Sequence, residues 1–277
     1  MHVATIQMVS AATVQANLDR ASELLAQAAA GGAEIAILPE YFCLLGHRDT
    51  DKLGIREPYG DGPIQRFLSD AARALKMWIV GGTVPLTLQQ GSAEDRQRRV
   101  TNTCLVFDPS GTCTQRYDKI HLFRFDNGTE RVDESRVLLA GHAPVTFTLP
   151  SRDGHRWTIG MSVCYDLRFP ELYRHYAKVG CELLLVPSAF TYTTGQAHWE
   201  LLLRARAVEN LAYVAAPAQG GLHENGRRTW GHSLQVDPWG EILCQRPEGD
   251  GVDMAELTQE RLQQVRMQLP ALEHRLL

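Results

Sequence analysis

One stretch of the chain, residues 157–180, joins a strand, a sharp turn and a helix around a single cysteine. The apolar run 158–163 has the length and composition of a strand, and Cys164 follows it directly. Pro170 then opens a helical segment that Gly180 closes, the usual placement of proline and glycine at helix termini. A strand that passes directly into a helix predicts an α/β unit, with a thiol in the turn between them.

The position of Cys164 suggests a nucleophile. A turn between a strand and a helix lifts its side chain above the edge of the sheet, as in the serine elbow of hydrolases. The positive end of the helix dipole also favours the thiolate over the thiol. The alternative is that Cys164 is one more small buried residue, which is the commonest fate of a free cysteine. The spacing alone leaves both interpretations open.

Helical and strand patterns alternate along the rest of the chain, which predicts an α/β fold. No shift of composition divides the sequence, so we expect one domain over residues 1–277. The expected helices are 14–30, 63–76, 170–180, 198–210 and 259–268. The expected strands are 3–8, 34–40, 77–84, 101–107, one leading into 117–123, 158–163, 182–186, 212–216, a hairpin over 233–243 and a final strand. Loops are expected at 41–62, 89–99 and 124–156.

The composition excludes several classes of protein. Of the 277 residues, 44% are hydrophobic and 22% are charged, so a large core is available without disulfides or metals. The formal net charge of −4 attracts neither nucleic acid nor an anionic membrane surface, and neither partner is expected. The N-terminus has no signal-peptide pattern, and no run approaches the length of a membrane span.

The cysteines lie far apart, at positions 43, 104, 113, 164, 181 and 244. They form no C-x-x-C pair and have no histidine at zinc spacing, so no metal site is expected. In a chain of this length, such a pattern predicts reduced thiols and a cytoplasmic protein.

Three ionisable residues directly follow apolar runs. Glu40 ends the run 34–40, Lys119 follows a strand that ends at Tyr117, and Cys164 follows the run 158–163. Because ligands bind beyond the carboxyl ends of strands in α/β sheets, we expect these side chains to meet. A carboxylate that accepts the thiol proton, a cation and a nucleophile are what acyl transfer through a thiol needs. Lys119 and the backbone N–H of Tyr165 are the expected donors to the carbonyl oxygen as it becomes negative.

Each of these residues also has a simpler interpretation. Glu40 is then a solvated side chain, and Lys119 pairs with Asp118 on the surface. Asp166 and Arg168 flank the cysteine, and we expect a structural ion pair between them, with Arg168 also a candidate for a substrate carboxylate.

Histidines at 121, 175, 198, 223 and 232 raise the possibility of a Cys–His pair. The local signatures of papain-like and caspase cysteines are missing, so His121 and His198 are expected to hold structure by hydrogen bonding. Either Arg204 or Arg206 is expected to be a buried structural cation. The apolar stripe of the segment 198–210 is expected to belong to the core or to a subunit interface.

The motifs around these residues resemble those of the nitrilase superfamily of carbon–nitrogen hydrolases. The matching positions of its Glu-Lys-Cys triad are Glu40 in Leu-Pro-Glu-Tyr, Lys119 in Tyr-Asp-Lys-Ile-His-Leu-Phe, and Cys164 in Cys-Tyr-Asp-Leu-Arg-Phe-Pro-Glu. Glu134 matches a second glutamate that members often carry after the lysine. Segments such as 188–190, 194–200, 203–207 and 231–233 are similar to the Nit branch of the superfamily. Segments 218–220 and 228–231, with His223, resemble its deaminated glutathione amidases more than its ω-amidases.

The resemblance implies a four-layer α-β-β-α sandwich and a thiol amidase without metal or organic cofactor. It implies a small-molecule amide as substrate, with 2-oxoglutaramate, a carbamoyl compound or a nitrile as alternatives to deaminated glutathione. It also implies a homodimer or higher homo-oligomer formed across a helical face. Arg168 and the Thr193–Thr194 pair are the candidates for binding an oxo-acid substrate. A departure from the family pattern at Arg124–Phe125 leaves the substrate open, because we expect that loop to line the pocket.

Overall fold

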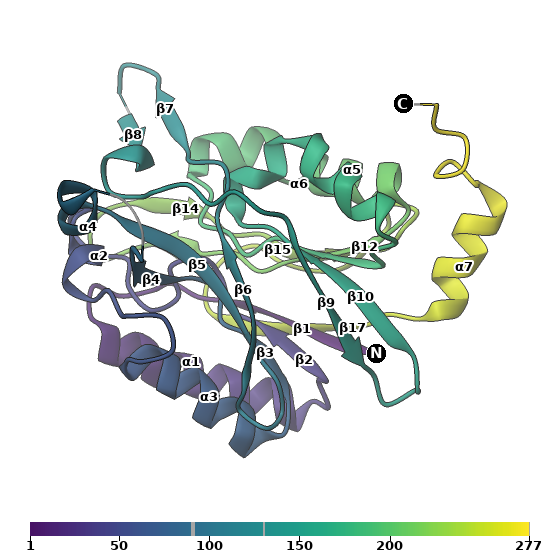
Figure 1. Ribbon diagram of the computed structural model, residues 1–277. Helices are drawn as coiled ribbons and strands as arrows, with labels where there is room; N and C mark the ends of the chain where they lie inside the picture. Colours follow the sequence, from purple (N-terminus) through teal and green to yellow (C-terminus); the bar gives the residue numbers. More distant parts are fainter. Residues whose placement is uncertain (90–91, 130, 277) are drawn as a thin grey trace.

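The computed structural model describes residues 1–89, 92–129 and 131–276. Positions 90, 91 and 130 of the expected loops, and position 277 of the expected domain, lie outside the described residues. The described residues form two large β-sheets that lie face to face, with helices on the outer face of each (Figure 1). Helices α1 (Val14–Ala30) and α3 (Pro63–Leu75) cover one sheet, and α5 (Pro170–Lys178) and α6 (Tyr192–Asn210) cover the other. The expected α/β class and the α-β-β-α layering are confirmed.

The first sheet has the strand order β17-β1-β2-β3-β5-β4, and β6 pairs with β5. Strands β1, β2 and β3 are parallel. Strand β6 has the same direction as β3, because each is antiparallel to β5. The carboxyl ends of β2 and β6 therefore point to the same edge of the sheet. The bounds are β1 (His2–Gln7), β2 (Ile35–Ile37), β3 (Trp78–Val80), β4 (Val84–Thr87), β5 (Val100–Phe107), β6 (Cys113–Asp118) and β17 (Gly251–Glu256).

The second sheet has the order β16-β15-β12-β11-β10-β9. Its central strands β10, β11 and β12 are parallel, so the segments that follow β10 and β11 leave the sheet at one edge. The bounds are β9 (Val145–Pro150), β10 (Arg156–Met161), β11 (Leu183–Leu185), β12 (Tyr213–Ala216), β15 (Ser233–Val236) and β16 (Ile242–Arg246).

Shorter elements connect the layers. They are α2 (Asp51–Gly54), α4 (Ala93–Arg98), the hairpins β7 (Arg124–Asp126) with β8 (Arg131–Asp133) and β13 (Gly220–Leu222) with β14 (Arg228–Trp230), and the 3₁₀ turns η1 (Glu134–Arg136) and η2 (Cys164–Arg168). The β7–β8 hairpin projects from the end of the molecule at which α2 and α4 also lie (Figure 1).

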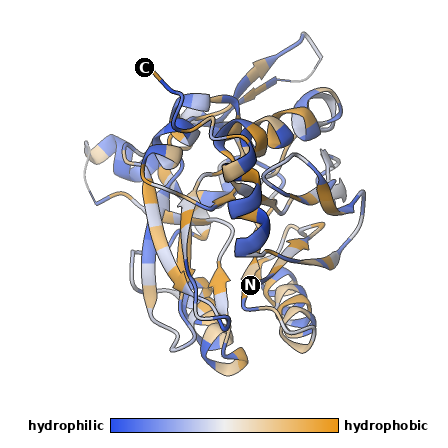
Figure 2. Ribbon diagram, turned by 90° about the vertical axis from the view of Figure 1, so that its right-hand side faces the viewer, coloured by the Kyte–Doolittle hydropathy of each residue, from blue (hydrophilic) through white to orange (hydrophobic). Residues whose placement is uncertain are grey.

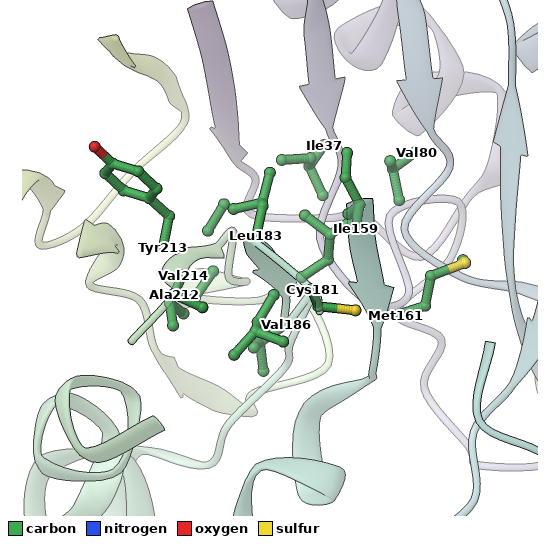
Figure 3. Close-up of a cluster of buried hydrophobic side chains, with 14 of the residues drawn as sticks. Ile37, Val80, Ile159, Met161, Cys181, Leu183, Val186, Ala212, Tyr213 and Val214 are labelled. Carbon is green, nitrogen blue, oxygen red and sulfur yellow. The ribbon is translucent and has the colours of Figure 1, made fainter. Parts of the chain in front are cut away.

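Apolar side chains of the two sheets meet in a buried layer (Figure 3). Ile37 and Val80 reach this layer from the first sheet, and Ile159 and Leu183 reach it from the second. Ala36 points to the opposite face of β2 and belongs to the cluster under α1 and α3. Because successive residues of a strand face opposite ways, a short apolar run fills both layers, as expected for a strand buried on both faces.

Helix α7 (Gln259–Gln268) lies outside these layers at the C-terminal end and confirms the expected helix at 259–268. Leu262 and Val265 are its buried residues. It is mostly coloured hydrophilic in Figure 2, whereas the strands behind it carry much of the hydrophobic colour. Within the described residues, every helix is too short or too polar to cross a membrane.

The expectation of one strand over 77–84 is wrong, because the chain forms β3 and β4 with two glycines between them. Gly82 has a φ of 49°, and a Cβ at this position would lie only 2.0 Å from the carbonyl oxygen of Pro39. Only glycine allows this close approach without strain. The tight turn thus packs directly against the residue that precedes Glu40.

The loop expected at 124–156 is also wrong in part, because it contains the β7–β8 hairpin, η1 and strand β9. Phe147 and Leu149 of β9 are buried at alternate positions, which is the period-2 pattern of a strand. The expected loop at 41–62 contains the short helix α2.

The first turns of two helices lack the apolar spacing of a helix and are instead stabilised by the side chain of the N-cap residue. Helix α6 starts at Tyr192, six residues earlier than expected, where the hydroxyl of Thr191 accepts a hydrogen bond from the N–H of Thr194. Helix α4 lies within the expected loop 89–99, and the hydroxyl of Ser92 accepts from the N–H of Asp95. Such caps stabilise a helix start that a search for apolar spacing misses.

Candidate active site

Cys164 lies in the turn between β10 and α5, at the edge of the second sheet. Its φ of 50° is in the left-handed region, which is unusual for a residue other than glycine. The N–H of Cys164 donates to the carbonyl oxygen of Pro187, at 3.0 Å, and this bond helps to hold the turn. Strained backbone of this kind is concentrated at functional sites, so the geometry agrees with the expected elbow.

The Glu40 carboxylate follows β2 and is fully buried among hydrogen-bond donors. Its Oε1 accepts from Nδ2 of Asn102 at 2.8 Å and from Nζ of Lys119 at 2.9 Å. Its Oε2 accepts from the N–H of Ala189 at 2.9 Å, across the gap between the two sheets. The thiol of Cys164 also hydrogen-bonds to this carboxylate. The structure therefore brings the expected base, cation and nucleophile together.

Lys119 lies between two carboxylates rather than on the surface beside Asp118. Its Nζ donates to Glu40, and to both oxygens of Glu134 at 2.9 Å each. Oε1 of Glu134 also accepts from the hydroxyl of Tyr41 at 2.9 Å, and its Oε2 accepts from the N–H of Phe123 at 2.7 Å. The ammonium is fully buried, so these ionic contacts are not screened by water.

The charges around Lys119 shift the pKa values of the two glutamates in opposite directions. Burial disfavours the ionised form of both, but the ammonium of Lys119 and several hydrogen bonds hold the pKa of Glu134 below its ordinary value. Burial, reinforced by the negative charge of Glu134, raises the pKa of Glu40 above its ordinary value despite Lys119. Burial alone would lower the pKa of Lys119, but the two carboxylates raise this pKa well above its ordinary value. Lys119 and Glu134 form a stable ion pair, and Glu40 is left as a stronger base than a surface carboxylate.

The thiolate preference expected for Cys164 is wrong in the free protein. Burial and the negative charge of Glu40 raise the pKa of the Cys164 thiol well above its ordinary value, although Lys119 lowers it. The turn after β10 is the short 3₁₀ segment η2, and α5 begins only at Pro170. The helix dipole is therefore too remote to outweigh burial, and the nucleophile depends on a proton acceptor.

The Asp166 carboxylate stabilises the cysteine turn through hydrogen bonds to several residues. Its Oδ2 accepts from the hydroxyl of Tyr117 at 2.6 Å and from the N–H of Val163 at 2.9 Å. Its Oδ1 accepts from the N–H of His121 at 2.9 Å and lies 2.7 Å from Nδ1 of the same residue. Asp166 thus ties the chain on both sides of Lys119 to the cysteine turn.

The expected ion pair between Asp166 and Arg168 is wrong, because the carboxylate is occupied by these donors. Nη2 of Arg168 instead lies 3.2 Å from Nδ1 of His198, and its guanidinium lies over the ring of Tyr165, 5.9 Å from the centroid. The structural hydrogen bonding expected of His121 and His198 is confirmed.

Helix α6 carries the expected buried cation. Arg206 donates to the carbonyl oxygen of Leu167 from both Nε and Nη2, at 3.0 and 2.8 Å. The expected apolar stripe, Leu201, Leu202, Ala205 and Val208, is not the buried face of the helix: Leu201 and Val208 are exposed, and Leu202 and Ala205 are half-buried. Leu203 and Ala207 lie in the core instead.

A pocket of about 540 Å³, its mouth included, opens over the cysteine. The three expected substrate-binding residues, Tyr165, Arg168 and Thr194, line it together with Glu40, Glu134 and Cys164. Thr193, the other member of the expected threonine pair, is exposed. The departure at Arg124–Phe125 lies in the β7–β8 hairpin, which contributes Val132 to the wall, and Phe123 before the hairpin also lines it.

Segments 218–220 and 228–230, whose resemblance to the deaminated glutathione amidases predicts a place beside the pocket, do not line it. Arg228 and Thr229 line an adjoining hollow that shares Ala189, Thr191 and Arg227 with the pocket. Gln219 lies behind the site, where its Nε2 donates to the carbonyl oxygen of Glu40 at 3.1 Å. The side chain of Arg228 points elsewhere, since it pairs with Glu248 at 2.7 Å. Its neighbour Arg227 lines the pocket instead.

Several site residues were not singled out from the sequence. Asn102 is a polar residue in the apolar run of β5, and a polar side chain in such a run indicates a buried hydrogen-bond partner. Ala189 acts through its backbone, and Tyr41 had only its place after Glu40 to mark it. Lys52, which also lines the pocket, comes from the segment 41–62 and carried no signal. Within the described residues, no cluster of three His, Cys, Asp or Glu side chains has an arrangement that could hold a metal ion.

Comparison with known proteins places this geometry in a family. The profile of the family described as carbon-nitrogen hydrolase matches residues 2–267. A protein of Synechocystis named deaminated glutathione amidase is 39% identical over 274 residues, covering 98% of this chain and 97% of that protein. Human omega-amidase NIT2 is 36% identical over 270 residues, covering 97% of this chain and 92% of that protein.

A solved structure shares the fold. Nit3 of Saccharomyces cerevisiae, described as a member of branch 10 of the nitrilase superfamily, superposes with a TM-score of 0.83 at 29% identity. The match covers 98% of this chain and 94% of Nit3. The expected membership of the nitrilase superfamily is confirmed. The chain belongs to the carbon-nitrogen hydrolase family.

Proposed function

We propose that this protein is a thiol amidase that hydrolyses a small C–N amide through a thioester on Cys164. One observation carries the proposal: the Glu40 carboxylate contacts the Cys164 thiol and the Lys119 ammonium at the floor of one pocket. A buried thiol with a raised pKa needs such a base to become a nucleophile. Glu134 is proposed to hold Lys119 in place, as its hydrogen bonds support.

Acylation follows from these contacts. Sγ of Cys164 attacks the amide carbonyl carbon as Glu40 accepts the thiol proton. The ammonium of Lys119 and the N–H of Tyr165 stabilise the negative charge that develops on the carbonyl oxygen. The N–H of Tyr165 lies in the first turn of η2, where the helix itself supplies no acceptor. Glu40 then gives its proton to the amine nitrogen as the C–N bond breaks, which leaves a thioester and a free amine.

Deacylation uses the same carboxylate. Glu40 accepts a proton from water as the water oxygen attacks the thioester carbonyl carbon, and the C–S bond breaks. The products are a carboxylic acid and the Cys164 thiol, which regains its proton from Glu40. This sequence requires no metal and no organic cofactor.

Deaminated glutathione is the substrate that we propose, with cleavage to 2-oxoglutarate and cysteinylglycine. The name of the Synechocystis relative supports this choice. Arg168 supplies a cation beside the cysteine turn for the oxo-acid carboxylate, and Thr194 supplies a hydroxyl nearby. A carboxylate in a partly dry pocket needs such partners, because burying it unpaired is costly.

The second candidate is an ω-amidase acting on 2-oxoglutaramate, which the human relative named omega-amidase supports. A competition assay with both amides, read by mass spectrometry, separates the two. We expect cysteinylglycine to be released far faster than ammonia. Faster release of ammonia would assign the protein to the ω-amidases. Cleavage of neither would point to a different amide, carbamoyl compound or nitrile.

We also propose that the chain is one carbon-nitrogen hydrolase domain that assembles as a homodimer or a higher homo-oligomer. Exposed apolar side chains support an interface on the outer face of α6: Leu201 is 68% exposed and Val208 is 43% exposed. Trp239, in the β15–β16 hairpin, is also exposed, and Arg204 of α6 donates to the neighbouring Gly240 at 2.9 Å. Sedimentation of a Leu201→Asp variant tests this, because a charge at the interface favours the smaller species.

The cytoplasm is the compartment that we propose. Six free cysteines, four of them buried, support a reducing environment. A fluorescent fusion located by microscopy tests this proposal.

A further inference from the structure

Two further cations line the same pocket, more exposed than the Lys119 ammonium at its floor. Lys52 comes from α2 and Arg227 precedes β14, and both line the pocket that contains Cys164. Exposure increases from the floor toward these two cations: the Lys119 side chain is fully buried, Lys52 is 15% exposed and Arg227 is 43% exposed. The pair therefore faces whatever part of a substrate extends toward solvent.

The only carboxylate that both cations are seen to share in the described residues is Asp49, and neither contact is close. Nζ of Lys52 lies 3.9 Å from Oδ1 of Asp49, and Nη1 of Arg227 lies 3.5 Å from the same oxygen. A charge-assisted hydrogen bond is about 2.7 to 2.9 Å long, so both donors can still form a closer bond. Lys52, Arg227 and Asp49 together carry a net positive charge, although the more distant carboxylates of Glu134 and Glu40 also act on Lys52.

The surroundings of Lys52 make an incoming anion favourable. Its Nζ lies over the ring of Tyr41, 4.5 Å from the centroid, and the hydroxyl of that tyrosine donates to Glu134. Burial lowers the pKa of Lys52, although Asp49 raises it. A second carboxylate beside the ammonium would compensate for the hydration that burial removes.

The position of the pair indicates the substrate part that it meets. The acyl group stays on Sγ of Cys164 and remains beside the cysteine turn, which carries Arg168 only four residues further along the chain. The amine must depart before water reaches the thioester, so its path leads toward solvent. Lys52 and Arg227 are thus placed to meet the leaving amine, if Arg168 binds the acyl group as proposed for the oxo-acid carboxylate.

We propose that Lys52 and Arg227 form a subsite for a carboxylate carried by the leaving amine, so that the preferred substrates have a negative charge on both sides of the scissile bond. The subsite rests on the proposed amidase function and narrows its substrate class. Peptide-like amines with a free C-terminal carboxylate meet this requirement, whereas ammonia, the product of a primary amide, does not.

The test uses two substrates that differ at one group: deaminated glutathione and its analogue with a carboxamide in place of the glycine carboxylate. The measured quantity is the ratio of kcat/KM for the acid to kcat/KM for the carboxamide, in which any general loss of activity cancels. We expect a ratio of about tenfold or more in the natural protein, as for a hydrogen bond to a charged group. Lys52→Ala and Arg227→Ala should each bring the ratio toward one, and Lys52→Arg should restore part of it.

Arg228→Ala is the matched control, because this neighbour of Arg227 pairs with Glu248 and lines only the adjoining hollow, not the pocket that contains Cys164. Its ratio should equal that of the natural protein. A natural ratio near one, or a ratio unchanged in both alanine variants, would overturn the subsite while leaving the amidase intact. Cleavage of neither substrate, nor of 2-oxoglutaramate, by the natural protein would overturn the proposed function, and the subsite with it.

Discussion

Oε1 of Glu40 lies 2.9 Å from Nζ of Lys119, although 79 positions separate the two residues in the chain. The contact exists because β2 and β6 run in the same direction and end at the same edge of the sheet. Asn102 donates to the same oxygen from β5, the strand that pairs with β6. The register of the first sheet thus sets the position of the base relative to the cation.

Replacing Glu40 removes the proposed base with little change of shape. A Glu40→Gln protein should fold, because the amide oxygen can still accept from Asn102 and Lys119 in the place of Oε1, although the amide nitrogen then faces the N–H of Ala189. It should lose about 10² to 10⁴-fold in the acylation rate, the range that general-base catalysis contributes. Single-turnover kinetics with a chromogenic amide measures this rate. A loss below tenfold would assign the proton transfer to another group.

Replacing Lys119 removes the positive charge that faces the substrate carbonyl. Lys119→Met should lower kcat by about 10² to 10³-fold, as the loss of an oxyanion donor does. It should also lower the free energy of unfolding, because Glu40 and Glu134 then face each other without a counter-ion. Stopped assays and urea unfolding measure the two effects. An unchanged kcat with a raised KM would make Lys119 a binding residue instead.

The pH dependence of kcat/KM reports the ionisation of Glu40. Because the base must be ionised, activity falls as the pH decreases through its pKa, which burial and Glu134 raise above the ordinary value. The acid limb should therefore lie above about 4.3, the ordinary value for glutamate. Glu134→Gln removes the negative charge that raises the pKa of Glu40, so the acid limb should move to lower pH. A limb that stays in place would show that Glu134 does not act on the base electrostatically.

The turn at Gly82 supports Glu40 by close packing. Gly82→Ala places a Cβ 2.0 Å from the carbonyl oxygen of Pro39 at a φ of 49°, so it should cost about 2 to 4 kcal/mol of stability and also reduce kcat. Gly128→Ala is the control: its φ is 86°, but its Cβ would meet no atom within 4 Å. The control should cost about 1 kcal/mol and leave kcat unchanged. Equal effects in thermal unfolding and turnover would argue against packing at Pro39.

Much of the fold could be predicted from the sequence, because the buried strands and amphipathic helices have clear periodicity. Apolar spacing predicted α1 and α7 at their observed bounds. The start of α6 was missed because the hydroxyl of Thr191 caps it. The break between β3 and β4 was missed because it depends on a contact between Gly82 and Pro39, which are distant in sequence.

The site was predictable to the extent that its residues follow strands. Glu40, Lys119 and Cys164 were found in this way, and Glu134 was found by resemblance. Partners that act through the backbone, such as Ala189, carry no side-chain signal. The raised pKa of Cys164 depends on burial, which the local turn pattern does not reveal.

The most direct test of the thioester mechanism is to trap the acyl group on Cys164. The protein is mixed with excess amide, acid-quenched within milliseconds, digested and analysed by mass spectrometry. A thioester on Cys164 predicts a mass increase equal to the acyl group on the peptide that contains this residue, and the disappearance of that increase as the substrate is consumed. The increase should be absent from Cys164→Ala, which should have no measurable turnover. Substantial turnover by Cys164→Ala, or an acyl group on any other residue during turnover, would contradict this mechanism.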